Sequence, residues 1–178
     1  MKKYWNFKAK KYPRPFENKG LMERKSIIKI IEKLGVDFRN KEIIDIGCGT
    51  GVYGLIFAKK AKHVLCLDFS NEMLKVLKDE AKKNSIENIK IVKKDFSKFD
   101  IGDYQKKFDI SFASMTPAVK NSIDIVKMER LSRKWCVYIG WAGKRENRIL
   151  NEVYSLFGLS HIFQRDILIL RKYLTEEK

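Results

Sequence analysis

The sequence predicts an α/β domain in which a mostly parallel sheet carries helices on both faces. Short apolar runs typical of buried strands alternate with segments whose apolar residues recur at helical spacing. The first run leads directly into a glycine-rich segment, Gly47-Cys48-Gly49-Thr50-Gly51, and each of the first three runs has an aspartate at its end. Such alternation packs as a parallel sheet, and 178 residues with 44% apolar content suit one domain with a single core.

The individual elements follow from the same periodicities. The predicted strands are residues 43–46, 63–68, 89–92, 108–113 and 135–139. The first predicted helix carries apolar residues from Leu21 to Leu34 and is ended by Gly35. The other predicted helices are residues 52–60, a helix capped by Ser70, a helix that begins at Thr116-Pro117 and reaches Arg130, and residues 149–157.

The last twenty residues allow two interpretations. Residues 159–163 and 167–170 can form a closing hairpin, or Asp166 can cap a final helix through Leu174 and leave a shortened, five-stranded sheet. The helix is favoured because Ile167, Leu170 and Leu174 fall on one helical face.

The glycine-rich segment follows the first predicted strand, where open α/β sheets bind ligands. Residues 49–54 fit a dinucleotide-binding pattern, but the same turn binds other nucleosides. Asp45, at the tip of this strand, would repel a pyrophosphate, whereas it suits the sulfonium and α-ammonium of S-adenosylmethionine. The acid therefore favours the methyl donor.

Two further aspartates support a nucleoside site. Asp68 ends the second predicted strand, where a carboxylate can accept both ribose hydroxyls, and Asp95-Phe96 follows the third, where an adenine would lie. A single aspartate could merely cap a turn, but three at consecutive strand ends make that explanation inadequate.

On these residues the chain resembles the class I S-adenosylmethionine-dependent methyltransferases, over about residues 43–139, with Asp45-Ile46-Gly47-Cys48-Gly49-Thr50-Gly51 as its most specific motif. The resemblance implies a Rossmann-like class I methyltransferase fold. It also implies that a leading segment such as Tyr4-Trp5-Asn6 with Tyr12-Pro13 closes over the cofactor, as in the small-molecule and unassigned branches. The implied cofactor-binding residues are Tyr12, Asp45, Gly47, Cys48, Gly49, Gly51, Asp68, Phe69, Asp95, Phe96 and Ser114, and Met115 and Trp141 are expected to wall the substrate pocket.

The sequence offers no convincing general base, and methyl transfer does not require one, because orientation and desolvation alone lower the barrier. His63 is expected at the wrong end of the sheet, and His161 lies near the chain end. Ser114-Met115-Thr116-Pro117 differs from the Asn/Asp-Pro-Pro-aromatic motif of base-amine methyltransferases. Three functions stay open: methylation of a small molecule, methylation of tRNA or rRNA, and a non-catalytic S-adenosylmethionine-binding module.

Charge and cysteine usage bear on partners. The net charge is +16, and residues 1–25 carry nine basic and two acidic residues interleaved with aromatics. Such an arm can hold nucleic acid or form a lid over the cofactor, and we expect the lid. Cys48, Cys66 and Cys136 fit neither a disulfide framework nor a metal site. We therefore expect a single cytoplasmic domain over residues 1–178, with a basic-aromatic lid segment (1–19), a core (20–178), a small-molecule substrate and no membrane partner.

Overall fold

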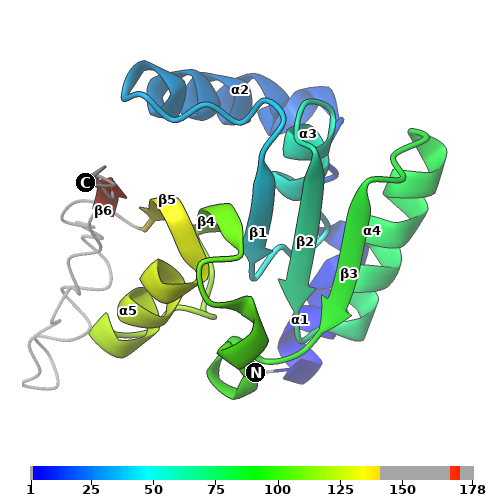
Figure 1. Ribbon diagram of the computed structural model, residues 1–178. Helices are drawn as coiled ribbons and strands as arrows, with labels where there is room; N and C mark the ends of the chain where they lie inside the picture. The colour runs from blue at the N-terminus through cyan, green and yellow to red at the C-terminus, as the bar shows by residue number, and fades with distance from the viewer. Residues whose placement is uncertain (1, 141–168, 173–178) are drawn as a thin grey trace, which may run out of the picture.

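The computed structural model describes residues 2–140 and 169–172. Six strands form one sheet in the order β3-β2-β1-β4-β5-β6. Strands β1 (Glu42–Ile46), β2 (His63–Asp68), β3 (Ile89–Lys93), β4 (Phe108–Ser114) and β5 (Ser132–Ile139) are parallel, and β6 (Ile169–Lys172) is antiparallel to β5 (Figure 1). The strand order reverses between β1 and β4, so their carboxyl ends open the crevice in which such sheets bind ligands.

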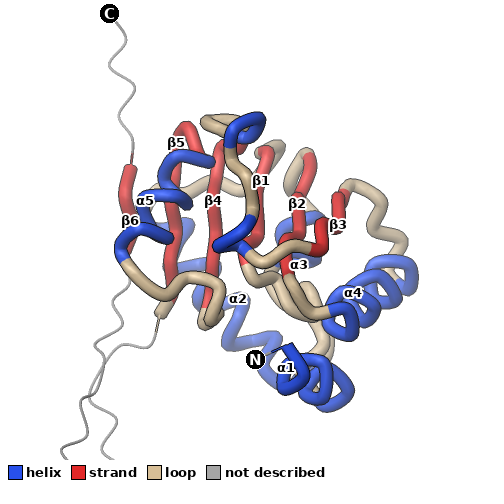
Figure 2. The backbone as a smooth tube through the Cα atoms, turned by 90° about the horizontal axis from the view of Figure 1, so that it is seen from below, coloured by secondary structure: helices blue, strands red, loops and turns tan. Residues whose placement is uncertain are grey.

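The helices cover both faces of the sheet, as the alternation of elements predicts. Helices α2 (Asn18–Lys33), α3 (Gly54–Ala58) and α4 (Asn71–Lys83) lie on one face, and α5 (Ser122–Leu131) lies on the other (Figure 2). Alternate residues of each strand face opposite layers. Ile43 accordingly belongs to the first core cluster, whereas Ile44 and Ile46 belong to the second.

The N-terminal segment folds back against the carboxyl edge of the sheet. It contains helix α1 (Lys2–Lys8) and the 3₁₀ helix η1 (Ala9–Lys11). Helix α1 packs against α4, and Ala9 is buried. Two further 3₁₀ helices, η2 (Phe96–Lys98) and η3 (Gly102–Tyr104), join β3 to β4.

The predicted capping of α4 is confirmed. Ser70 Oγ accepts a hydrogen bond from the Met73 amide (3.3 Å) and caps the helix. The residues of the predicted apolar face are buried, namely Met73, Leu74, Leu77 and Ala81. No helix in the described part of the chain is long and apolar enough to span a bilayer.

Three expectations for the helices are corrected. The helix expected at Thr116-Pro117 begins only at Ser122, because Asn121 Oδ1 caps it by accepting from the Asp124 amide (3.0 Å). The helix expected over residues 52–60 is shorter, Gly54–Ala58, because residues 47–53 form the turns after β1. The expected final helix is wrong over Ile169–Lys172, which form strand β6. Their antiparallel pairing satisfies the backbone hydrogen-bonding groups along the otherwise free edge of β5. The helix expected over residues 149–157 lies outside the described residues.

Replacing Phe57 by Ala should cost about 3–5 kcal/mol of unfolding free energy. Its buried ring stacks on Phe38 at a centroid distance of 4.5 Å and meets Phe112 edge-on at 4.8 Å. Urea unfolding measures the loss. The control is Phe7→Ala, which removes a ring that is 76% exposed and should change stability by no more than about 0.5 kcal/mol. Similar losses in the two variants would contradict this description of the core.

Candidate cofactor site

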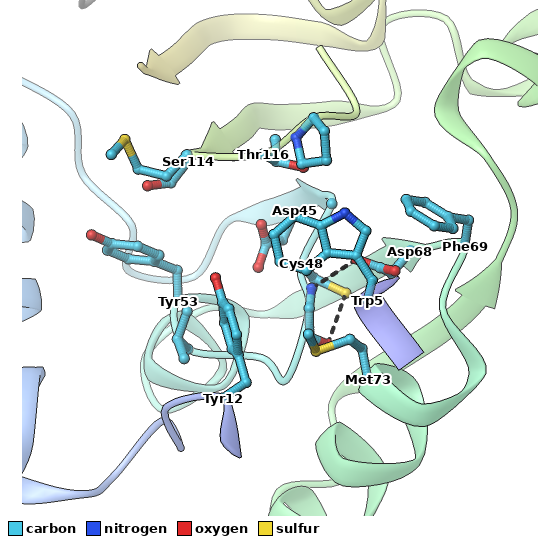
Figure 3. Close-up of a pocket in the computed structure, with 15 residues that line it drawn as sticks. Trp5, Tyr12, Asp45, Cys48, Tyr53, Asp68, Phe69, Met73, Ser114 and Thr116 are labelled. Atoms are coloured by element: carbon cyan, nitrogen blue, oxygen red, sulfur yellow. Dashed lines mark hydrogen bonds between the residues drawn. The ribbon is translucent and has the colours of Figure 1, made fainter. Parts of the chain in front are cut away.

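A pocket opens at the carboxyl ends of β1, β2 and β4, between the sheet edge and the N-terminal segment. Tyr12 and Met73 lie across it from Ser114 and Thr116 (Figure 3). The pocket, together with the solvent-filled space at its mouth, has a volume of about 510 Å³. Its lining residues are Trp5, Tyr12, Asp45, Gly47, Cys48, Gly49, Val52, Tyr53, Asp68, Phe69, Met73, Ser114, Met115, Thr116 and Pro117.

The glycine loop after β1 forms the floor of this pocket. Gly47 has a φ of +68°, and a Cβ at this position would overlap Thr116 Oγ1. Only a glycine therefore lets the loop lie this close to the segment after β4. The Gly47 and Cys48 amides donate to the Leu67 carbonyl at 2.7 and 3.1 Å. The loop is thereby fixed to the end of β2.

Asp68 is positioned by the same loop. Its Oδ2 accepts a hydrogen bond from the Gly49 amide (3.0 Å) and its Oδ1 accepts one from the Ser70 amide (2.8 Å). Burial nevertheless raises the pKa of this carboxyl. Because each carboxylate oxygen has a second lone pair, Asp68 can still accept two hydrogen bonds from a ligand in the pocket.

Asp45 is a buried acid without a countercharge. It is 3% exposed and takes part in no salt bridge within the described residues. Burial raises its pKa to about 7, although the Gly54 backbone amide opposes the shift. A cationic ligand in the pocket would supply the missing positive charge and favour ionisation.

The N-terminal segment is held over the pocket by hydrogen bonds from both flanking loops. Thr50 Oγ1 donates to the Pro13 carbonyl (2.7 Å), and Ser70 Oγ donates to Asn6 Oδ1 (2.7 Å). Trp5 and Tyr12 each directly precede one of these anchored residues, contact each other edge-on with ring centroids 6.1 Å apart, and both line the pocket. The segment therefore contributes one wall of the site.

The comparisons with known proteins bear on the identity of this pocket. A family profile described as a methyltransferase domain matches residues 37–156, which include β1 to β5 and the glycine loop. The chain belongs to the S-adenosylmethionine-dependent methyltransferases.

Individual relatives match only parts of the chain. The ribosomal RNA small subunit methyltransferase A of Mesomycoplasma hyopneumoniae (strain 232) is 37% identical over 87 residues, which are 49% of this chain and 32% of that protein. The chain thus covers about a third of the length of this curated relative.

Solved structures share the fold at low sequence identity. A methyltransferase from Aquifex aeolicus has a TM-score of 0.62 at 16% identity, with 86% of this chain and 87% of that chain covered. Phosphoethanolamine N-methyltransferase 1 of Haemonchus contortus, in complex with phosphoethanolamine and S-adenosylhomocysteine, also scores 0.62, at 17% identity, with 80% and 32% covered.

Most of the methyltransferase site residues expected from the sequence meet in the pocket. Those that line it are Tyr12, Asp45, Gly47, Cys48, Gly49, Asp68, Phe69, Ser114 and Met115. The hydroxyl oxygen of Ser114 is buried and makes no hydrogen bond of regular geometry within the described residues, although the neighbouring Tyr53 hydroxyl interacts with it. A ligand in the pocket can therefore supply the missing hydrogen bond. The cofactor of this family, S-adenosylmethionine, carries the positive charge and the hydroxyls that these side chains can satisfy.

Three expected residues lie elsewhere among the described residues. A Cβ at Gly51 would lie 3.0 Å from Leu55 and Leu77, so this glycine serves the packing of α3 and α4. Asp95 caps η2 and borders an adjacent hollow that also contains Phe69. The Phe96 side chain is buried in the second core cluster, which leaves only its backbone for a ligand. Trp141 lies outside the described residues.

Five residues that the sequence does not predict at the site also line the pocket: Val52, Tyr53, Met73, Thr116 and Pro117. The sequence predicts Met73 on the buried face of a helix and Thr116 at the start of a helix. Neither prediction indicates that these side chains line the pocket. For Trp5, the sequence predicts only that it belongs to the segment over the cofactor and not that its side chain lines the pocket. Among these residues, only Pro117 offers a sequence signal, because a proline disfavours helical backbone in the residue before it and so indicates a loop after β4.

No histidine lines the methyltransferase pocket in the described part of the chain. His63 begins β2 at the opposite edge, where its Nδ1 lies 3.9 Å from Glu42 Oε2. Burial raises the pKa of both tyrosines in the pocket, Tyr12 and Tyr53, so neither is a base at neutral pH. This arrangement fits a reaction that proceeds by orientation and exclusion of water.

The affinity for S-adenosylhomocysteine should rise about tenfold between pH 6 and pH 8, since a carboxyl with a pKa of about 7 is mostly neutral at the lower pH and mostly ionised at the higher. The ionised form attracts the ligand's α-ammonium group. Asp45→Asn should remove this pH dependence and lower the affinity at pH 8. Calorimetric titration at several pH values measures both effects, and an equally steep profile in the variant would assign the dependence to another group.

The same substitution should raise the Tm of the unliganded protein at pH 8. The folded-state pKa of Asp45 lies above its unfolded value, so its favourable contribution is present at low pH and is lost as the pH rises through about 7. The amide of Asn carries no charge to bury. Thermal unfolding should therefore show a gain in Asp45→Asn at pH 8 that disappears at pH 4.

Proposed function

We propose that this protein transfers the methyl group of S-adenosylmethionine to a small-molecule acceptor. The observation that carries the proposal is the N-terminal segment, which is anchored at Asn6 and Pro13 and encloses the pocket with Trp5 and Tyr12. A pocket walled by the N-terminal segment suits a small acceptor better than a macromolecule, because side chains can surround a small molecule on most sides. The Haemonchus contortus enzyme, which shares the fold and is named for phosphoethanolamine, supports an acceptor of this size.

The pocket residues have distinct tasks in this proposal. Asp68 binds the ribose hydroxyls, Asp45 pairs with the positive charge of the methionine part, and Ser114 donates or accepts one further hydrogen bond. When bound, the donor would supply an activated methyl group: its carbon–sulfur bond would break with the electron pair passing to sulfur, and the acceptor atom would bond to the methyl carbon. Any proton on the acceptor atom would be lost to solvent after the product leaves the pocket. Trp5 and Tyr12 exclude water, and Met115 and Thr116 border the acceptor side.

The remaining contacts rest on the family resemblance. Asp95 and the Phe96 backbone are proposed to hold the adenine, next to the Phe69 ring, and Trp141 is proposed to wall the substrate side. The general base is unassigned because in-line displacement at a sulfonium does not need one.

RNA methylation is the second candidate. The net charge of +16 and the 37% identity to a ribosomal RNA methyltransferase favour it. RNA binding through phosphates would weaken steeply with salt. Incubation with radiolabelled donor and separated metabolite and RNA pools distinguishes the two candidates. We expect label in the metabolite pool, and label confined to RNA would overturn the small-molecule proposal.

The Asp68→Ala variant should bind S-adenosylhomocysteine about 2–3 kcal/mol more weakly, because a carboxylate that accepts two hydroxyls makes charge-assisted hydrogen bonds. Asp79→Ala, at an exposed position on α4, is the matched control and should bind normally. Calorimetry with NAD in place of the nucleoside should give no binding. Preference for NAD, or full affinity in Asp68→Ala, would reject this cofactor site.

The double variant Trp5→Ala/Tyr12→Ala should also bind S-adenosylhomocysteine at least about tenfold more weakly, because both rings line the pocket. Tyr4→Ala/Phe7→Ala removes two rings from the same segment that lie outside the pocket and are 54% and 76% exposed. This control should keep its affinity for S-adenosylhomocysteine. Equal affinities in the two double variants would show that the segment is not a lid.

A further inference from the structure

The N-terminal segment has a second, outward-facing surface that the cofactor site does not use. A groove runs along it, bordered by Tyr4 and Phe7 of α1 and by Lys8 and Lys11. Helix α1 has no buried residue. Tyr4 and Phe7 are 54% and 76% exposed, and burying two aromatic rings against a ligand would be favourable by the usual transfer free energy of apolar surface.

The charge of this groove has one sign. Lys8 and Lys11 line it and no acidic residue does. Lys8 Nζ lies 5.4 Å from the centre of the Tyr4 ring, which holds the ammonium beside the aromatic surface. Cations next to exposed rings complement a molecule that combines an anionic group with an aromatic or apolar body.

The groove adjoins the cofactor pocket. Trp5, Tyr12 and Met115 line both hollows, so a molecule in the groove lies against the wall of the pocket. Met115 holds a left-handed backbone conformation (φ +48°), which is costly for a residue with a side chain. Its amide donates to the Ile139 carbonyl (2.8 Å), and this bond keeps the residue in the shared wall.

We propose that this groove holds the outer part of the methyl acceptor while its reacting atom reaches the pocket at the shared residues Trp5, Tyr12 and Met115, and that the acceptor is a small molecule with an anionic oxygen group and an aromatic or apolar body. The anionic group lies between Lys8 and Lys11, and the body packs on Tyr4 and Phe7. The proposal rests on the proposed methyl transfer, because it assigns the acceptor side of that same site.

Two fluorescent probes that differ only in charge test the groove. The anionic probe is 8-anilinonaphthalene-1-sulfonate, and the neutral probe is N-phenyl-1-naphthylamine, which has the same rings without the sulfonate. Both are titrated into the 178-residue chain saturated with S-adenosylhomocysteine. The charge-reversal variant Lys8→Glu/Lys11→Glu should bind the anionic probe at least about tenfold more weakly and the neutral probe equally well.

Lys10→Glu is the matched control, because Lys10 is exposed on the same segment and does not line the groove. It should bind the anionic probe within about twofold of the unaltered protein. Phe7→Ala should weaken both probes. Equal effects of Lys10→Glu and the charge-reversal variant, no binding of the anionic probe, or equal loss of the neutral probe would each overturn the proposal.

The two proposals fail differently. If calorimetry shows no binding of S-adenosylhomocysteine, the proposed function fails, whatever the probes report. If S-adenosylhomocysteine binds and the anionic probe does not distinguish the variants, only the groove proposal fails.

Discussion

The close approach of the glycine loop to two strand ends is the constraint on which the rest of the site depends. Gly47 lies against Thr116, where no side chain fits, and the Gly49 amide donates to the Asp68 carboxylate. These two contacts join β1 to the segments that follow β4 and β2. They place Asp45, Asp68 and Ser114 around one space, although the three residues come from three strands.

The glycine loop and the loop after β2 together position the N-terminal segment. Thr50 and Ser70 are both buried, and their hydroxyls donate to Pro13 and Asn6. Because both anchors belong to loops at the pocket, a ligand that orders these loops would also order the segment. If the segment acts as the proposed lid, these two neutral hydrogen bonds couple its closure to cofactor binding. The outer surface of the segment, with its lysines and exposed rings, is left free for a second molecule.

Asp45 illustrates how the site trades stability for binding. A buried carboxyl with a pKa of about 7 disfavours the ionised form in the unliganded protein. The family's cofactor supplies a positive charge, which makes the ionised form favourable once it is bound. The unfavourable burial thus becomes a preference for a cationic ligand over a pyrophosphate.

The sequence predicts what local patterns determine. Asp45 and Asp68 at the ends of β1 and β2, the glycine loop after β1 and the Ser70 cap are local patterns, and each lies in the structure where its pattern placed it. Asp95 follows β3 as its pattern predicts, but it caps η2 outside the pocket. Thr116 and Met73 could not be placed, because their position at the pocket arises from contacts between distant segments. The apolar spacing around Ile169 suits a helix as well as a strand, so the sequence does not decide between them. The pairing with β5, which the sequence does not show, favours the strand.

Hydrogen exchange measured by mass spectrometry, with and without S-adenosylhomocysteine, tests most directly whether the pocket and its lid form one cofactor site. The account predicts slower exchange in residues 2–12 and 47–51 on binding, and unchanged exchange in α5, which packs on the opposite face. Protection of the glycine loop without protection of residues 2–12, or protection confined to α5, would contradict it.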